Sequence, residues 1–153
     1  MEWAMTQNNL GNAYCNLPTG DKAENLKRAI ACYEAALRVR TQNDFPVDWA
    51  ETQVNLGNAY AELPTGDAEE NLKKAIACYE AALRVFTLRD FPKEWAMAQN
   101  NLGIAYIDLR AGHREQNLTR AIACFEAAIT GYKTAGLTDK AEKLKQGLDR
   151  LKQ

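Results

Sequence analysis

Apolar side chains recur along this chain at steps of three, four and seven residues, which is the spacing of one face of an α-helix. In the first such segment, Trp3, Leu10, Tyr14 and Leu17 share a face. No segment of the sequence alternates apolar and polar residues over the length that a strand needs. The pattern therefore predicts a chain made of helices and short loops.

The helical pattern is copied at a fixed interval of 46 residues. Trp3 returns as Trp49 and Trp95, and the segment 9–14 returns unchanged at 55–60. A fixed period of this order is typical of a solenoid, in which each repeat covers the apolar face of its neighbour. We therefore expect any function to lie on a surface. The predicted repeats are 1–46, 47–92 and 93–136.

Each repeat is predicted to contain two helices joined by a short loop. Pro18 and Pro64 end the first helices of two repeats, because proline lacks the amide hydrogen that a continuing helix uses. Asp21 and Asp67 then begin the second helices, since an aspartate there accepts a hydrogen bond from an exposed backbone amide. The first helices are expected at 3–17, 49–63 and 95–109.

Glycine recurs inside each predicted first helix, at Gly11, Gly57 and Gly103. A glycine in a helix interior costs about 1 kcal/mol relative to alanine. Its return in every repeat predicts that another helix approaches closely at this point.

The third repeat loses the pattern after Ile129, and a last helix is predicted to begin near Thr138 or Asp139. Residues 137–153 carry one apolar stripe among lysines, as expected of an amphipathic helix that caps a solenoid. The first helix has no such cover, so we expect its apolar face to allow association into a homo-oligomer. The stripe of the last helix comprises Leu137, Ala141, Leu144, Leu148 and Leu151.

The charges of the chain nearly balance, with a formal net charge of −1. No run of basic residues is long enough to follow a phosphate backbone, so nucleic acid is not an expected partner. No apolar run approaches the roughly 18 residues that span a membrane, and no basic segment followed by an apolar one opens the chain. We expect a cytoplasmic protein without membrane contact.

The positions of the cysteines indicate small packing side chains rather than reactive groups. Cys32, Cys78 and Cys124 occupy the same place in successive repeats, about 10 Å apart and therefore beyond disulfide reach. His113 lies in a predicted loop away from any cysteine pair, so no metal site is expected. Cys15 has no cysteine counterpart and is predicted to be an accessible thiol.

No motif of an enzyme occurs in the sequence. We find no glycine-rich phosphate loop followed by lysine, and no nucleophile elbow. The carboxylate pair Glu69 and Glu70 lies at a helix start, where capping explains it. We expect neither catalysis nor a cofactor.

Two segments of each repeat are, in the first repeat, Leu10-Gly11-x-x-Tyr14 and Ala29-x-x-x-Tyr33-x-x-Ala36, and similar segments recur in the other two repeats. Together they resemble the core of the tetratricopeptide repeat. Two features differ, because the period exceeds the usual 34 residues or so and the tryptophan lies earlier. Long repeats of this kind resemble those of large bacterial multidomain proteins. The resemblance implies an all-α, right-handed alpha-solenoid of three helix-turn-helix repeats with a C-terminal capping helix.

In the tetratricopeptide family the first helices line a concave face, and the residues between the packing positions contact a peptide or protein. The resemblance therefore implies a peptide-binding set on three helices. In repeat 1 the set is Met5, Asn8, Asn9, Asn12 and Asn16. In repeat 2 it is Glu51, Val54, Asn55, Asn58 and Glu62. In repeat 3 it is Met97, Asn100, Asn101, Ile104 and Asp108.

Asparagine dominates this set, and its amide both donates and accepts, so a row of asparagines can pair with the backbone of an extended peptide. Asn12 and Asn58 also match the asparagine that grips a carboxylate in chaperone-binding relatives. Asn8 and Val54 stand where that clamp has basic side chains, so the resemblance favours a mixed polar and apolar groove. In the alternative interpretation, asparagine merely tolerates a solvated helix face.

Two functions follow from the sequence. The first is a scaffold that binds a peptide or partner segment in the concave groove. The alternative is a spacer or self-assembling array without a specific ligand, since the first two repeats agree at 34 of 46 positions and copies can stack end to end. Such close identity also fits an engineered or consensus-like origin.

Overall fold

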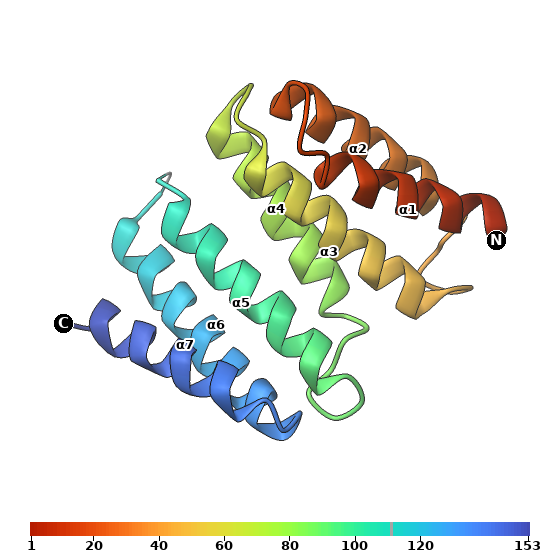
Figure 1. The fold of residues 1–153 in the computed structure, drawn as a ribbon. Coiled ribbons are helices and arrows are strands. Elements are labelled where there is room, and N and C mark those ends of the chain that lie inside the picture. Colours follow the sequence, from red (N-terminus) through yellow and green to blue (C-terminus); the bar gives the residue numbers. More distant parts are fainter. Residues whose placement is uncertain (111) are drawn as a thin grey trace. The chain divides into compact units, whose positions relative to one another are not determined.

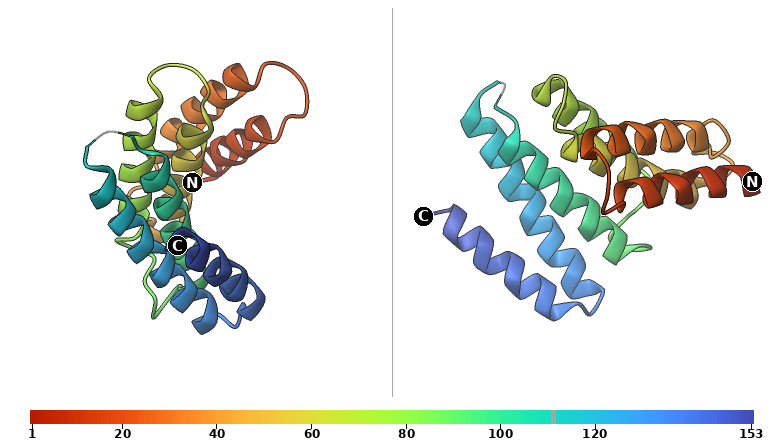
Figure 2. Two further views of the ribbon diagram at one scale, coloured as in Figure 1. Left: turned by 90° about the vertical axis from the view of Figure 1, so that its left-hand side faces the viewer. Right: turned by 45° about the horizontal axis from the view of Figure 1, so that its top comes forward.

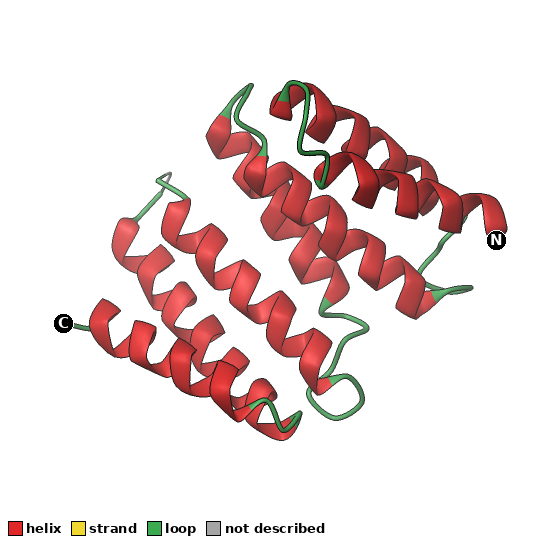
Figure 3. Cartoon of the chain, in the orientation of Figure 1, coloured by secondary structure: helices red, strands yellow, loops and turns green. Residues whose placement is uncertain are grey.

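The computed structural model describes residues 1–110 and 112–153, and every regular element in these ranges is a helix (Figure 3). This confirms the all-α prediction. In chain order the helices are α1 (Glu2–Cys15), α2 (Lys22–Leu37), α3 (Pro46–Glu62), α4 (Ala68–Ala82), α5 (Pro92–Asp108), α6 (Arg114–Thr134) and α7 (Thr138–Leu151).

The chain divides into an N-terminal unit, Met1–Val85, and a C-terminal unit, Phe86–Gln153. Within them the two helices of each repeat lie against each other, as the pairs α1 and α2, α3 and α4, and α5 and α6 show (Figure 1). In the N-terminal unit α2 also packs against α3, so one helix pair covers the next. This is the solenoid arrangement that the period predicted.

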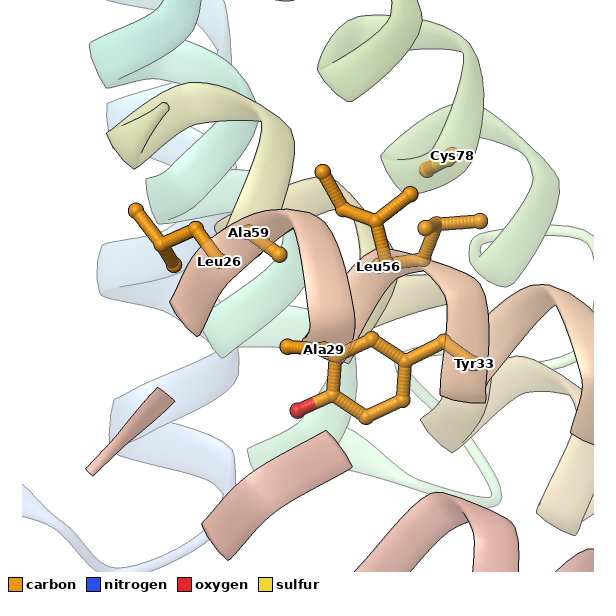
Figure 4. Packing of buried hydrophobic residues seen from close by; sticks show 7 residues of the cluster. Leu26, Ala29, Tyr33, Leu56, Ala59 and Cys78 are labelled. Carbon is orange, nitrogen blue, oxygen red and sulfur yellow. The ribbon is translucent and has the colours of Figure 1, made fainter. Parts of the chain in front are cut away.

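The core of the N-terminal unit lies between its two helix pairs. Leu26, Ala29 and Tyr33 of α2 pack with Leu56 and Ala59 of α3 (Figure 4). All five side chains are buried. The first repeat is therefore held to the second by apolar surface removed from water.

The C-terminal unit ends in the predicted capping helix. α6 continues to Thr134, where Gly136 with φ 74° turns the chain, and α7 then runs back along α6 (Figure 2). Of the predicted stripe, Ala141 and Leu148 are buried, whereas Leu151 at the helix end is exposed. α7 thus covers α6 through a narrow apolar stripe.

The second helices of two repeats begin at the predicted caps. Asp21 Oδ1 accepts a hydrogen bond from the Glu24 backbone amide at 2.8 Å. Asp67 Oδ1 accepts from the backbone amides of Glu69 and Glu70, at 2.9 and 3.2 Å. Just before these caps, the turns contain Gly20 and Gly66 with φ of 87° and 83°.

The observed first helices begin and end earlier than predicted. α3 and α5 start at Pro46 and Pro92, three residues before the tryptophans. Proline is favoured at a first helical position because its missing amide hydrogen would have no partner there. α1 ends at Cys15, so Leu17 lies in the loop.

The apolar stripe that contains Trp3 is open on α1 and covered on α3. Trp3 and Leu10 are 53% and 40% exposed, whereas Leu56, the counterpart of Leu10, is 6% exposed. Leu56 is buried because α2 packs on that face of α3. The buried stripe of α1 is a different one, formed by Ala4, Asn8 and Gly11.

The recurring glycines mark a close approach between helix and ring, as predicted. A Cβ atom on Gly11 would lie 2.6 Å from Tyr33 Cε1. On Gly57 it would lie 2.7 Å from Tyr79 Cε1, and on Gly103 the same distance from Phe125 Cε1. Real Cβ atoms essentially never come this close to another heavy atom, so only glycine fits.

We expect the substitution Gly57→Ala to lower the free energy of unfolding by about 1 to 3 kcal/mol. Alanine is the better helix former, but its methyl group would meet the ring of Tyr79, which is 2% exposed and has no room to move away. Urea unfolding followed by circular dichroism measures the difference.

Gly147→Ala is the matched control. Gly147 also lies in a helix, and no described atom beyond its own helix backbone is within 4 Å of the Cβ position. This variant should gain up to about 1 kcal/mol. A Gly57→Ala protein as stable as the parent would refute the close approach of ring and helix.

Candidate functional site

The predicted site residues of the N-terminal unit lie on α1 and α3 at three different depths. Met5, Asn9 and Asn16 of α1 are exposed, as are Glu51 and Glu62 of α3. A second group is partly buried and comprises Asn12, Val54, Asn55 and Asn58. Asn8 is buried, with 7% of its surface exposed.

Several of these residues meet at one cavity of about 200 Å³. It lies within the N-terminal unit and takes its lining from α1, α2 and α3. The lining is mostly polar, with four asparagines and one carboxylate. It comprises Asn12, Cys15, Asn16, Leu26, Tyr33, Asn55, Asn58, Ala59 and Glu62.

Tyr33 anchors the side chain of Asn12 at this cavity. Its hydroxyl donates to Asn12 Oδ1 at 2.8 Å and lies 3.5 Å from Cys15 Sγ. Because the phenol has one hydrogen and gives it to Asn12, the thiol is the donor in the second contact. Burial holds the pKa of Tyr33 well above its ordinary value, so the phenol stays neutral.

The same bond recurs in the second repeat, where the Tyr79 hydroxyl donates to Asn58 Oδ1 at 2.8 Å. Burial also raises the pKa of Tyr79. In the third repeat both partners are exchanged together, because phenylalanine replaces the tyrosine at Phe125 and isoleucine replaces the asparagine at Ile104. The asparagine after the glycine therefore accepts the hydrogen bond of the tyrosine in its own repeat.

Asn8 belongs to a buried polar network rather than to the open surface, which corrects its assignment to the ligand face. Asn55 Nδ2 donates to Asn8 Oδ1 at 3.2 Å, and Thr52 Oγ1 lies at the same distance from that oxygen. Thr52 in turn accepts from Arg40 Nη1 at 2.9 Å. Arg40, 4% exposed, also pairs with Asp48 through Nη2 and Oδ1, 3.3 Å apart.

The C-terminal unit carries its predicted residues on α5. Met97, Ile104 and Asp108 are exposed, and Asn100 and Asn101 are partly buried. Met97 and Ile104 are two helical turns apart and lie on one side of α5. This surface is more apolar than that of α1, which has an asparagine at the place of Ile104.

Four lining residues lie outside the predicted set, namely Cys15, Leu26, Tyr33 and Ala59, of which the sequence predicted only Cys15 to be accessible. The joint exchange of tyrosine and asparagine for Phe125 and Ile104 was the signal that could have revealed Tyr33.

The cysteines are free thiols. Cys78 and Cys124 are buried, whereas Cys32 and Cys15 are partly exposed. Burial, with a smaller effect of the nearby Glu34 carboxylate, raises the pKa of Cys78 to about 12. Among the described residues no three of His, Cys, Asp or Glu gather as metal ligands would, and no helix has both the length and the apolar character to cross a membrane.

A double-mutant cycle tests the bond between Asn12 and Tyr33. We expect Asn12→Ile and Tyr33→Phe each to lower the free energy of unfolding by about 1 to 2 kcal/mol, because each leaves a polar partner without its bond. The double variant, which copies the pair Ile104 and Phe125, should lose less than the sum, with a coupling energy of about 1 kcal/mol. Urea unfolding provides the values.

The control cycle combines Asn12→Ile with Tyr79→Phe, the tyrosine that bonds Asn58 instead. These two effects should add. A first cycle that is also additive would show that the hydrogen bond contributes nothing.

Comparison with known proteins gives one match. Residues 3–42, which include α1 and α2, match the family model described as Tetratricopeptide repeat. Neither the curated proteins nor the solved structures contain a match to this chain. The matched segment is similar to a tetratricopeptide repeat, and the helix pair that it forms recurs in α3 with α4 and in α5 with α6.

Proposed function

We propose that this chain is a scaffold that binds an extended segment of a partner protein along its first helices. Tetratricopeptide repeats generally mediate protein–protein interaction and form a non-enzymatic scaffold. The observation that carries the proposal here is the cavity between α1, α2 and α3, into which side chains of the predicted binding set converge. We place this function in the cytoplasm, because free thiols are usual in a reducing compartment.

The exposed residues of the set suit a peptide with mixed contacts. Met5, Met97 and Ile104 are 49%, 39% and 48% exposed, so each offers apolar surface to a partner. Asn9 and Asn16 lie beside Met5 on the same side of α1 and offer polar contacts. Within each unit, exposed side chains of this kind can hold alternate side chains of an extended peptide and its backbone amides.

The anchored asparagine keeps one polar group for a ligand. Asn12 Oδ1 is engaged by Tyr33, so the amide nitrogen of Asn12 is the group that remains to donate. A fixed donor at a cavity wall loses little conformational freedom on binding a backbone carbonyl. The bond to tyrosine thus pre-organises the asparagine as well as stabilising the fold.

Panning of a displayed library of random nonapeptides tests this proposal. We expect Met5→Glu combined with Ile104→Glu to lower the binding affinity of the recovered peptides at least about tenfold, because each change places a charge where an apolar contact is needed. Both residues are exposed, so thermal unfolding should be unchanged.

The control combines Trp3→Glu, on another face of α1, with Leu151→Glu on α7; both side chains are exposed. It should bind within about twofold of the parent protein. Peptides that bind both double variants equally would place the site elsewhere.

A second function, self-association, is favoured by the open apolar stripe of α1. This stripe repeats the residues by which α3 packs on α2, yet Trp3 and Leu10 of α1 and Leu17 in the loop after it are all exposed. We propose that a second copy of the chain covers it.

Leu10→Lys should abolish any concentration-dependent increase in mass measured by light scattering, because a charge cannot be buried in an apolar contact without loss. Met5→Lys, on the other side of α1, is the control and should leave the increase unchanged. A parent protein of constant monomer mass across concentration would rule out this function.

A further inference from the structure

We infer that the cavity of the N-terminal unit binds the side chain of a lysine or arginine in the partner segment. This inference rests on the proposed scaffold function and specifies what the cavity recognises. The evidence is the kind of polar atom that its walls present, the place of its apolar residues and the basic side chain that already lies at its edge.

The walls of the cavity present acceptor atoms. Asn16 uses its amide nitrogen to donate to the Asn12 backbone oxygen at 2.8 Å, and Asn55 uses its own to donate to Asn8. Each of these two amides keeps its Oδ1 atom as an acceptor. Together with the carboxylate of Glu62, these oxygens form a set that suits a group with several N–H donors and a positive charge.

The other wall atoms fit the aliphatic part of such a side chain. Leu26 and Ala59 contribute apolar surface to the cavity. Lysine and arginine bury their methylene stems against apolar surface while their charged ends reach polar groups. A cavity of about 200 Å³ takes roughly six or seven water molecules at about 30 Å³ each, which is the scale of one long side chain.

The charge at the cavity favours a cation over an anion. Glu62 is the ionisable carboxylate of the lining, and no lysine or arginine belongs to the described lining. Lys22 of α2 approaches from outside, with Nζ 3.2 Å from Glu62 Oε2. Both side chains are largely exposed, so this ion pair is weak and a ligand cation can replace it.

The exchange with Lys22 makes a specific prediction about affinity. A ligand cation must compete with Lys22 for the Glu62 carboxylate. Lys22→Ala should therefore strengthen binding by about two- to fivefold, whereas a purely structural role of Lys22 would leave affinity unchanged.

The experiment uses the nonapeptide library on the full chain and on two variants. Peptides recovered on the parent protein should share lysine or arginine at one position. Glu62→Gln should lower the affinity of these peptides about tenfold, since it replaces an ion pair by a hydrogen bond to an uncharged amide. Glu70→Gln, an exposed carboxylate of α4 outside the cavity lining, is the matched control and should change affinity less than twofold.

A second measurement assigns the effect to the contact itself. Replacing the shared basic residue of a recovered peptide by norleucine should cost at least this factor on the parent protein, and clearly less on Glu62→Gln, where part of the contact is already lost. Thermal unfolding of Glu62→Gln should match the parent, because the residue is exposed.

The outcomes separate the two proposals. Recovered peptides that depend on Met5 and Ile104 but lack a shared basic residue, or that bind Glu62→Gln and Glu70→Gln alike, overturn the cation site and leave the scaffold function standing. A library that yields no peptide specific for the parent protein overturns both.

Discussion

The contact between an aromatic ring and a glycine is the constraint on which the rest of the structure depends. In every repeat the ring of the second helix lies where the side chain of the first helix would be, against Gly11, Gly57 or Gly103. This sets how closely the two helices of a pair approach, because interiors are packed too densely to absorb a misplaced methyl group. With that distance set, the ring hydroxyl reaches the residue that follows the glycine, and Tyr33 meets Asn12 there.

The candidate site follows from this packing. Tyr33 serves the core through its ring and the cavity through its hydroxyl, which holds Asn12 and receives the thiol of Cys15. The amides at the cavity wall are thus oriented by groups that are themselves fixed in the core. Pre-organised polar groups on a rigid helix pair bind a flexible peptide with a smaller loss of conformational entropy. Stability and recognition therefore share the same residues in this repeat.

Periodicity was enough to predict the helices, the caps at Asp21 and Asp67 and the close approach at the glycines, because each has a local cause in the sequence. The depth of single polar residues could not be predicted in this way. Asn8 and Asn9 are neighbours of the same type, yet Asn8 is buried by a network that begins at Arg40 in the next loop. Burial of a polar side chain depends on partners distant in sequence, and a helical pattern does not name them.

The paired exchange at Ile104 and Phe125 has a consequence for how such repeats diverge after duplication. A repeat that changes only its tyrosine leaves an amide oxygen without its donor, and one that changes only its asparagine leaves a phenol without its acceptor. Both single steps pass through a less stable protein, although the two end states are each self-consistent. The two positions are therefore expected to change together as the copies diverge. Selection for stability in a library randomised at one of these sites at a time would remove each single change, so the pair of isoleucine and phenylalanine would not be found.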